Sequence, residues 1–323
     1  MRYLFALLVY IAFTASCASS PVTSSYPAGM QVMNLAPNFV TFLDRTNGQP
    51  IDARVAEFKR ELGPRFPSFY GIARYGGERT QTEQDSVIRR AIEDFPAIRE
   101  RYIEKTARFG TIMPKALTSF AQRFPDFSPN IPVYVLHSLG EADGGVRSLP
   151  DGDALFFGID SMVRLHGDND ETPFFHHELF HTYHTPELKE CAGGPMWAYL
   201  WVEGLATYVS KALNPQASDA ELLLDIPVGV AARYRETLAD SLAEFERVVD
   251  STDRAVYRDL FTRASTSRLP ARRGYYLGYV VAAEASPTYS LSALASLNCS
   301  QARELVLATV RSLHQKPTFD IAQ

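Results

Sequence analysis

The chain has 323 residues, of which 46% are hydrophobic, and a formal net charge of −5, which is typical of a globular protein with a sizeable core. The mildly acidic balance gives no sign of the basic surface that nucleic-acid-binding proteins usually carry, so we expect no nucleic-acid partner. No apolar run reaches the roughly 18 residues of a membrane-spanning helix, so the sequence predicts no helix of that kind.

The first residues have the organisation of an export signal. Arg2 precedes an unbroken apolar run from Leu4 to Phe13, and small residues then lead to Cys17. This order predicts a secretory signal peptide over residues 1–16. A cysteine directly after small residues resembles the lipobox of bacterial lipoproteins, which implies cleavage before Cys17 and acylation of that residue. An ordinary cleaved signal or a buried first helix is the alternative.

The same resemblance implies a location. Ala18, directly after the cysteine, resembles the residue found in lipoproteins that are sorted to the outer membrane. Residues 17–36 are rich in Ser, Pro and Ala, which suits a flexible tether between the lipid and the folded domain. We therefore expect an exported protein that faces the periplasm, is held at the bacterial outer membrane by its lipid, and folds over residues 37–323.

Helical patterns dominate the first half of this folded region. Apolar residues recur at three- and four-residue spacing over four stretches: 52–62, 82–94, 96–109 and 114–124. Pro114 stands where the last of these helices would begin, and Gly110 stands where the preceding one would end. The sequence therefore predicts a helical part over residues 37–125.

Residues 126–323 begin with two short strand-like runs, 131–137 and 153–160, both β-branched or aromatic. The Gly-, Asp- and Pro-rich segment between them is typical of a loop or a hairpin connection. After residue 170 the chain is again helical in pattern. We expect a single α+β domain, mostly α, with a small sheet just before a histidine-rich helix.

That helix carries four of the seven histidines, in the segment ETPFFHHELFHTYHTPELKE. A capping threonine followed by proline at its start, and a second proline beyond its end, predict a helix over 173–184. His177, Glu178 and His181 form an HExxH motif in it. The two histidines lie one turn apart on one face, so their imidazoles can reach one tetrahedral ion. Glu178 is offset and can reach a water held by that ion.

The sequence predicts the roles of the remaining histidines of the helix, His176 and His184, less specifically. Two histidines and one carboxylate already complete a catalytic metal site, so we expect His176 and His184 to support the ligands from behind or to lie at the surface. The alternative for the whole segment is a helix that carries these residues by coincidence.

A third ligand is available in the next helical segment, 196–213. Glu203 is its sole acidic residue, and nearly all of its neighbours are apolar. A lone carboxylate in such a helix is costly unless it binds a metal or pairs with an arginine, and both possibilities stay open at this point.

Three motifs together carry a resemblance: HHELFH, then WVEGLATY, then RRGYYLGYVVAAE over 272–284. They resemble the gluzincin metallopeptidases and are similar to an uncharacterised family of predicted zinc-dependent proteases, many of them exported. The match covers about residues 170–285. It implies a zincin-like core with zinc at His177, His181 and Glu203, and Glu178 as the catalytic base.

Thr207 marks a departure from that pattern. Thermolysin-like gluzincins carry an aspartate four residues after the ligand glutamate, where it accepts the N–H of a ligand histidine. Thr207 takes this place here, and a hydroxyl orients a ligand less strongly than a carboxylate does.

The resemblance also implies that one of three clustered tyrosines, Tyr275, Tyr276 or Tyr279, faces the zinc and donates to the oxyanion of the intermediate. We take Tyr276 as the candidate, with aromatic packing as the alternative for each ring. Arg272 and Arg273 either bind a substrate carboxylate or form a solvated helix start.

These features predict a zinc peptidase that acts on peptides or proteins. Glu178 takes a proton from the attacking water and passes it to the leaving amine. The run at 153–160, as an edge strand, would hold an extended substrate. The rival predictions are a binding module that keeps the fold, and a zinc hydrolase of a non-peptide amide or ester. An exported chain permits Cys191 and Cys299 to pair, but the sequence leaves that pairing open.

Overall fold

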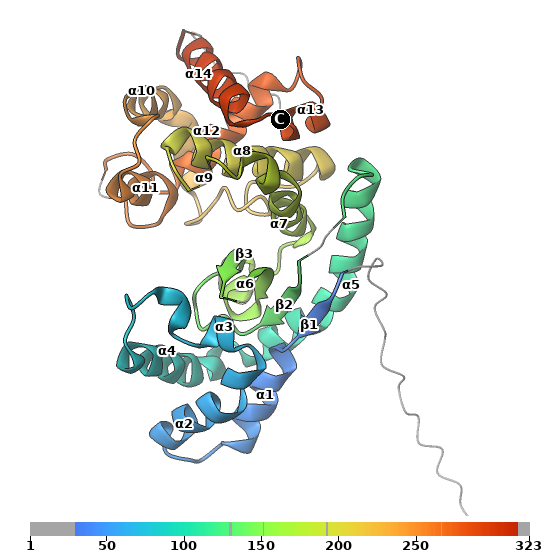
Figure 1. The fold of residues 1–323 in the computed structure, drawn as a ribbon, viewed down its shortest axis with the longest axis vertical. Helices are drawn as coiled ribbons and strands as arrows, with labels where there is room; N and C mark the ends of the chain where they lie inside the picture. Colours follow the sequence, from blue (N-terminus) through green and yellow to red (C-terminus); the bar gives the residue numbers. More distant parts are fainter. Residues whose placement is uncertain (1–29, 129–130, 151, 192, 266, 316–323) are drawn as a thin grey trace, which may run out of the picture.

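The structure is a computed structural model that describes residues 30–128, 131–150, 152–191, 193–265 and 267–315. The predicted signal peptide and the predicted lipidation at Cys17 lie outside these residues. In the described part of the chain, no helix combines the length and apolar character needed to cross a membrane. Helices predominate, around one four-stranded sheet. In Figure 1 the N-terminal helices lie on one side of the sheet and the C-terminal helices on the other.

Five helices precede the second strand: α1 (Ala36–Arg45), α2 (Ile51–Glu61), α3 (Pro67–Tyr70), α4 (Gln81–Asp94) and α5 (Arg99–Arg123). The expectation of two helices separated near Gly110 is wrong, because α5 runs unbroken through Pro114. A proline inside a helix costs about 3 kcal/mol. One continuous apolar face, from Phe109 through Met113 and Ala116 to Phe120, is fully buried across that proline. Burying each large side chain of that face contributes about 1.5–3 kcal/mol, which offsets the cost.

The sheet has the order β1-β2-β4-β3. Its strands are β1 (Val32–Asn34), β2 (Val133–Leu136), β3 (Gly144–Leu149) and β4 (Gly152–Gly158). β1 and β4 lie parallel to β2, one on each side, and β3 runs antiparallel to β4 in a hairpin. The strands predicted at 131–137 and 153–160 are confirmed as β2 and β4. The glycine-rich segment between them forms β3 as well as loop.

Two sequence-based expectations about this sheet are wrong. Residues 32–34 were expected in a flexible tether, but they form β1, in register with Val133–Val135 of β2, so the fold begins before residue 37. The run at 153–160 was expected as an edge strand, but β4 lies inside the sheet. Leu155, Phe156 and Phe157 are all buried, and such a continuous apolar run is typical of a strand covered on both faces. The free edge beside it belongs to β3.

The sheet leads into α6 (Ile159–His166), α7 (Thr172–His184) and α8 (Met196–Leu213). The predictions of helices at 173–184 and 196–213 are therefore confirmed. Thr172 was expected to precede α7 as its cap. It is instead the first helical residue, and its N–H donates to Asp170 Oδ1 at 3.0 Å. Six more helices complete the described chain: α9 (Val230–Glu236), α10 (Leu238–Val248), α11 (Arg254–Phe261), α12 (Arg273–Ala285), α13 (Leu291–Ala295) and α14 (Cys299–Gln315).

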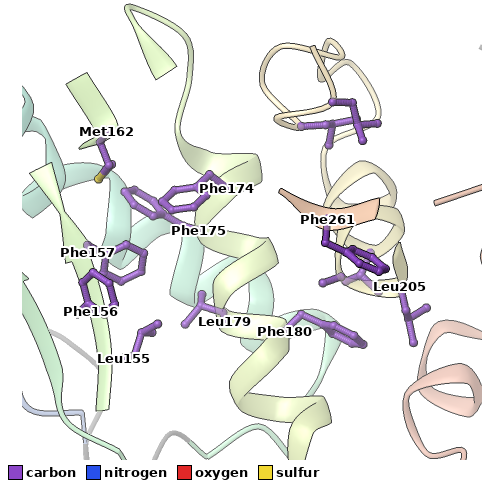
Figure 2. Close-up of a cluster of buried hydrophobic side chains, with 14 of the residues drawn as sticks. Leu155, Phe156, Phe157, Met162, Phe174, Phe175, Leu179, Phe180, Leu205 and Phe261 are labelled. Atoms are coloured by element: carbon purple, nitrogen blue, oxygen red, sulfur yellow. The ribbon is translucent and has the colours of Figure 1, made fainter. Parts of the chain in front are cut away.

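The apolar faces of α7 pack it between the sheet and α8 (Figure 2). Phe175 lies 5.2 Å, between ring centroids, from Phe157 of β4 and from Phe109 of α5. Leu179 and Phe180 continue this packing one turn later, and both are buried. These faces of α7 are buried in the core. The remaining face carries the HExxH histidines and lines a cavity.

The backbones of α8 and α12 approach closely at two glycines. A Cβ built on Gly204 would lie 2.1 Å from the carbonyl carbon of Gly278, and one built on Gly278 would lie 2.3 Å from the carbonyl oxygen of Leu200. No other residue type fits at either position without moving a helix. This contact brings Glu203 of α8 beside the first turn of α12.

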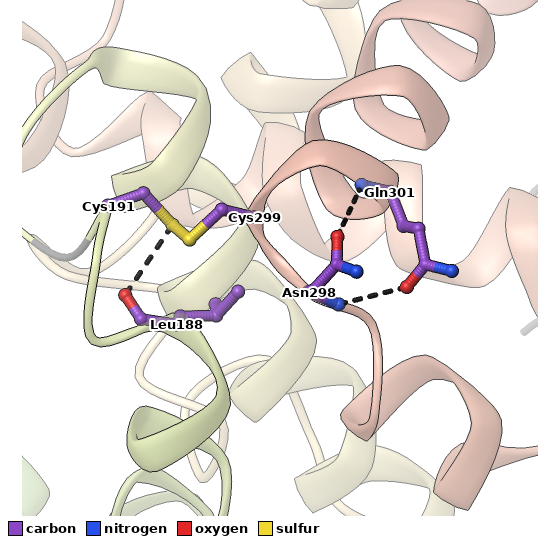
Figure 3. Close-up of a disulfide and its surroundings, with 5 residues drawn as sticks. All are labelled: Leu188, Cys191, Asn298, Cys299 and Gln301. Carbon is purple, nitrogen blue, oxygen red and sulfur yellow. Dashed lines mark hydrogen bonds between the residues drawn. A yellow bond between two sulfur atoms is a disulfide. The ribbon is translucent and has the colours of Figure 1, made fainter.

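Cys191 and Cys299 form a disulfide between the segment after α7 and the first residue of α14 (Figure 3). Their α-carbons lie 6.0 Å apart, within the range that a disulfide requires. The pairing that the sequence left open is therefore present, and it closes a loop across 108 positions of the chain.

Replacing both cysteines by alanine is expected to lower the free energy of unfolding by about 2–5 kcal/mol, because a crosslink over a long loop restricts the unfolded chain. Denaturant unfolding of the wild type and of the Cys191→Ala/Cys299→Ala variant measures the difference. Reduced wild type should unfold at the same midpoint as the variant. Equal midpoints for the oxidised wild type and the variant would contradict the prediction.

Candidate metal centre

His177 and His181 of α7 and Glu203 of α8 come together in the structure. The Nε2 atoms of the two histidines lie 3.0 Å apart, and each lies 3.4 Å from Glu203 Oε2. All three side chains are partly buried, and the three ligand atoms form a group that can hold one metal ion. The sequence-predicted ligands therefore meet, although 21 residues separate His181 from Glu203.

The charges of this group suit metal binding. Burial by itself raises the pKa of Glu203, but the adjacent His181 and His177 outweigh it and hold that pKa well below its usual range. Burial lowers the pKa of His177, and the nearby Glu203 only partly offsets this effect. For His181 the carboxylate of Glu203 outweighs burial, so its pKa is raised. An ionised carboxylate at this position is what a metal ligand requires.

Glu178 lies beside the ligands and is buried, and its Oε2 has no hydrogen-bond partner among the described residues. Burial raises the pKa of Glu178 to about 8, and the nearby Asp143 and Glu203 add to this while His181 opposes it. Gly144 of β3 makes the room: a Cβ there would lie 3.3 Å from Glu178 Cδ and 2.6 Å from the Phe174 ring. A buried polar atom without a protein partner is rare and calls for a partner from the cavity.

Thr207 stands one turn after Glu203 on α8, next to the ligand His177. Its hydroxyl donates to Glu203 O at 2.8 Å, and its oxygen lies 3.5 Å from His177 Nδ1. The expected neighbour of His177 is therefore in place. At 3.5 Å this contact is at the outer limit of a hydrogen bond, so it orients the imidazole weakly.

His176 and His184 were expected either behind the ligands or at the surface. Both are buried, which excludes the surface alternative for each. Asn214 Nδ2 donates to His176 Nδ1 at 2.8 Å, and the Nε2 atom lies 2.8 Å from Ser119 Oγ. These contacts of His176 connect α7 to α5 and to the end of α8. His184 has no hydrogen-bond partner for either ring nitrogen among the described residues, and its ring packs 5.0 Å from Phe180.

The choice of Tyr276 as the oxyanion donor is wrong. The ring of Tyr276 stacks 5.4 Å from Tyr234, and its buried hydroxyl does not reach the cavity that contains Glu178. Tyr275 lines that cavity instead, and it lies close enough to Glu203 for that carboxylate to contribute to its raised pKa, after burial. Consecutive residues of a helix point about 100° apart, so only one of the pair can face the site.

The ligands, Glu178 and Tyr275 share one cavity of about 1060 Å³. The edge strand β3 forms part of its wall, from Gly144 to Ser148. Among the polar residues of the wall that sequence reasoning missed are Asp143, Arg147 and Tyr257. No motif identifies these residues, because they are distant in sequence from α7 and α8, which carry the candidate ligands.

The two arginines before α12 have different places. Arg273 is buried and pairs with Glu244 and Asp259, so it neither faces solvent nor remains available to a substrate. Arg272 lines the cavity, with its guanidinium 4.5 Å from the centroid of the Tyr275 ring.

The buried His184 predicts acid sensitivity. Burial lowers its pKa to about 3, against 6.5 for an unfolded histidine. The folded state then binds fewer protons than the unfolded state between these values, so the stability is complete above pH 6.5 and falls towards pH 3. Between pH 7 and pH 4, His184→Leu is expected to remove about 3 kcal/mol of this acid-induced loss, at 1.36 kcal/mol for each pH unit below 6.5. Urea unfolding of both proteins from pH 7 to pH 4 tests this, and parallel curves would refute it.

Comparison of the chain with protein-family models, with curated proteins and with solved structures finds no match in any of the three. The resemblance to gluzincins therefore depends on the three sequence motifs. The grouping of His177, His181 and Glu203 beside the buried Glu178 agrees with those motifs.

Proposed function

We propose that the chain is a zinc-dependent peptidase with a zincin-like core, in which His177, His181 and Glu203 hold one zinc ion. The observation that carries the proposal is the spacing of three ligand atoms beside a buried, unpartnered Glu178. A small sheet followed by two packed helices supports the fold assignment.

The residue types of the three ligands and the spacing of their atoms both suit zinc. Two histidines and one glutamate, with a position left open, form a known catalytic zinc site. The three separations define a circle of about 1.9 Å radius through the ligand atoms. Zinc bonds to nitrogen and oxygen are about 2.0–2.2 Å long, so the spacing of the three atoms would suit one zinc ion. When bound, zinc supplies Lewis-acid polarisation of a carbonyl and lowers the pKa of a water molecule.

Glu178 has the placement and proton affinity of a general base and acid. Its free Oε2 lies next to the ligands, so it can accept a proton from a water in the cavity and later give it to the leaving amine. A carboxyl group with a pKa raised to about 8 exchanges a proton near neutral pH. A binding module that keeps the fold has no need of this buried carboxyl. Its presence argues against that rival prediction.

Tyr275 is suited to stabilise the oxyanion. Burial and the neighbouring carboxylates raise its pKa well above the ordinary value, so the phenol keeps its proton and can donate a hydrogen bond. The edge strand β3 supports a peptide as substrate, because its free edge offers unpaired main-chain groups along the cavity wall.

The disulfide supports the export that residues 1–16 predict, because stable disulfides form mainly in oxidising compartments such as the periplasm. We therefore retain the proposal of an exported lipoprotein anchored through Cys17. Release of a Cys17→Ser variant from the membrane fraction would support the anchor, and unchanged membrane attachment would count against it.

Zinc content and peptide cleavage test the central assignment. Glu203→Ala is expected to lose most of the bound zinc, because the site then keeps only two protein ligands. Glu178→Gln is expected to keep its zinc and to lose activity on a mixed peptide library by about 10²–10⁴-fold. Elemental analysis and mass spectrometry of the peptides, with and without chelator, provide the measurements.

Glu221→Ala is the matched control, since this carboxylate also lines the cavity but lies outside the ligand group. It should keep both zinc and activity. Full zinc content in Glu203→Ala would remove Glu203 from the ligand set. Zinc-loaded wild type that cleaves no peptide, but does hydrolyse a simple amide or ester, would favour the rival hydrolase.

The tyrosine assignment has its own test. Tyr275→Phe is expected to lower kcat by about 10²–10³-fold with little change in KM, because the lost hydrogen bond acts mainly in the transition state. Tyr276→Phe, one residue away but outside the cavity, should change kcat by less than about 2-fold. The reverse ranking of the two variants would restore Tyr276 as the donor.

A further inference from the structure

Arg272 brings an unneutralised positive charge to the wall of the metal cavity. No hydrogen bond or ion pair joins its guanidinium to another described residue, and its buried Nε has no partner. The guanidinium lies over the face of the Tyr275 ring, 4.5 Å from the ring centroid. Arg272 as a whole is half-buried, but its buried Nε is withdrawn from water. Buried guanidinium nitrogens are normally paired with a carboxylate or a phosphate, so a bound anion would complete the environment of Arg272.

The backbone holds Arg272 in this place. The residue has φ +60°, a left-handed conformation that residues other than glycine adopt rarely and at some cost. Its neighbour Arg273 is fixed in the core by Glu244 and Asp259, which anchors the start of α12. The strained residue and the anchored one together position the guanidinium of Arg272 towards the cavity.

Two acidic groups of the same wall, Asp143 and Glu141, are engaged with other partners, although Arg272 is near enough to Asp143 to contribute to its lowered pKa. Asp143 Oδ2 lies 2.8 Å from His166 Nε2, and Glu141 pairs with Arg74 and Arg147. No carboxylate oxygen of the described residues lies within 4.0 Å of the Arg272 guanidinium. The guanidinium of Arg272 is therefore available to an anion that enters the cavity.

We propose that Arg272 binds a carboxylate of the substrate next to the bond that is cut. The inference deepens the proposed peptidase function and rests on it, because the bound carboxylate belongs to a substrate only if the chain is a peptidase. Because Arg272 stacks on Tyr275, which faces the metal group, the carboxylate would lie about one or two residues from the scissile bond, at about 3.3–3.6 Å per extended residue. The group is either the C-terminal carboxylate of a peptide or an acidic side chain.

Binding to the zinc-loaded Glu178→Gln protein tests this without requiring turnover. Three fluorescent peptides share one sequence and end in a free carboxylate, in an amide, or in an amide preceded by aspartate. Fluorescence anisotropy is expected to give a Kd about 10- to 100-fold lower for at least one carboxylate peptide than for the plain amide. The free-acid and aspartate arms separate the two sources of the carboxylate.

Adding Arg272→Gln should abolish this preference, whereas adding Arg263→Gln should keep it. Arg263 is the matched control because it is exposed, lines the same cavity and carries the same charge. Arg272→Gly guards against misfolding, since glycine accepts φ +60° and should retain the wild-type unfolding midpoint while losing the preference.

Equal affinity for all three peptides, or no binding of any, would overturn the role of Arg272. A preference that survives Arg272→Gln and Arg272→Gly would do the same. These outcomes are distinct from failure of the proposed function. If wild type cleaves peptides without regard to a carboxylate, the peptidase stands and the inference falls. If the carboxylate preference appears but no peptide is cleaved, the anion site stands and the peptidase assignment falls.

Discussion

The close contact between Gly204 and Gly278 is the constraint on which the candidate site depends. Two helices meet there with no side chain between them, since a Cβ on either glycine would overlap the opposite backbone. Glu203 precedes the first glycine, and the turn with Arg272 and Tyr275 precedes the second. A larger residue at either position would separate α8 from α12 and move Glu203, the third candidate ligand, away from the tyrosine that shares its cavity.

The other half of the site depends on polar contacts that hold the first half of α7 against α5 and α8. At the start of α7 the buried Glu171 pairs with Lys105 of α5, and Lys105 Nζ also donates to Gly167 O at 2.9 Å. A buried pair of this kind is costly to break from one side, because an unpaired charge remains in the core. Farther along, His176 joins α7 to α5 and α8. The orientation of the α7 face that carries His177 and His181 is therefore set by contacts on its opposite faces.

Local pattern accounts for much of what the sequence predicted correctly. The bounds of α7 and α8, and the strands β2 and β4, follow from periodicity, capping residues and prolines. The errors occur where distant packing outweighs a local signal. Pro114 lies inside α5 because one apolar face is buried on both sides of it. β1 joins the sheet although its composition resembles a tether, because β2 offers a free edge beside it.

The sequence by itself determined that His177, Glu178 and His181 share one helix and that Glu203 is a lone carboxylate in the next, because one-turn spacing and isolation among apolar residues are local properties. Only the tertiary structure decided that Glu203 reaches both histidines and that Tyr275 rather than Tyr276 enters the cavity. It also decided that Arg272 lies beside Tyr275 with no partner for its Nε in the described part of the chain. These outcomes depend on the rotation of α12 against α8, and no local pattern encodes the rotation of one helix relative to another.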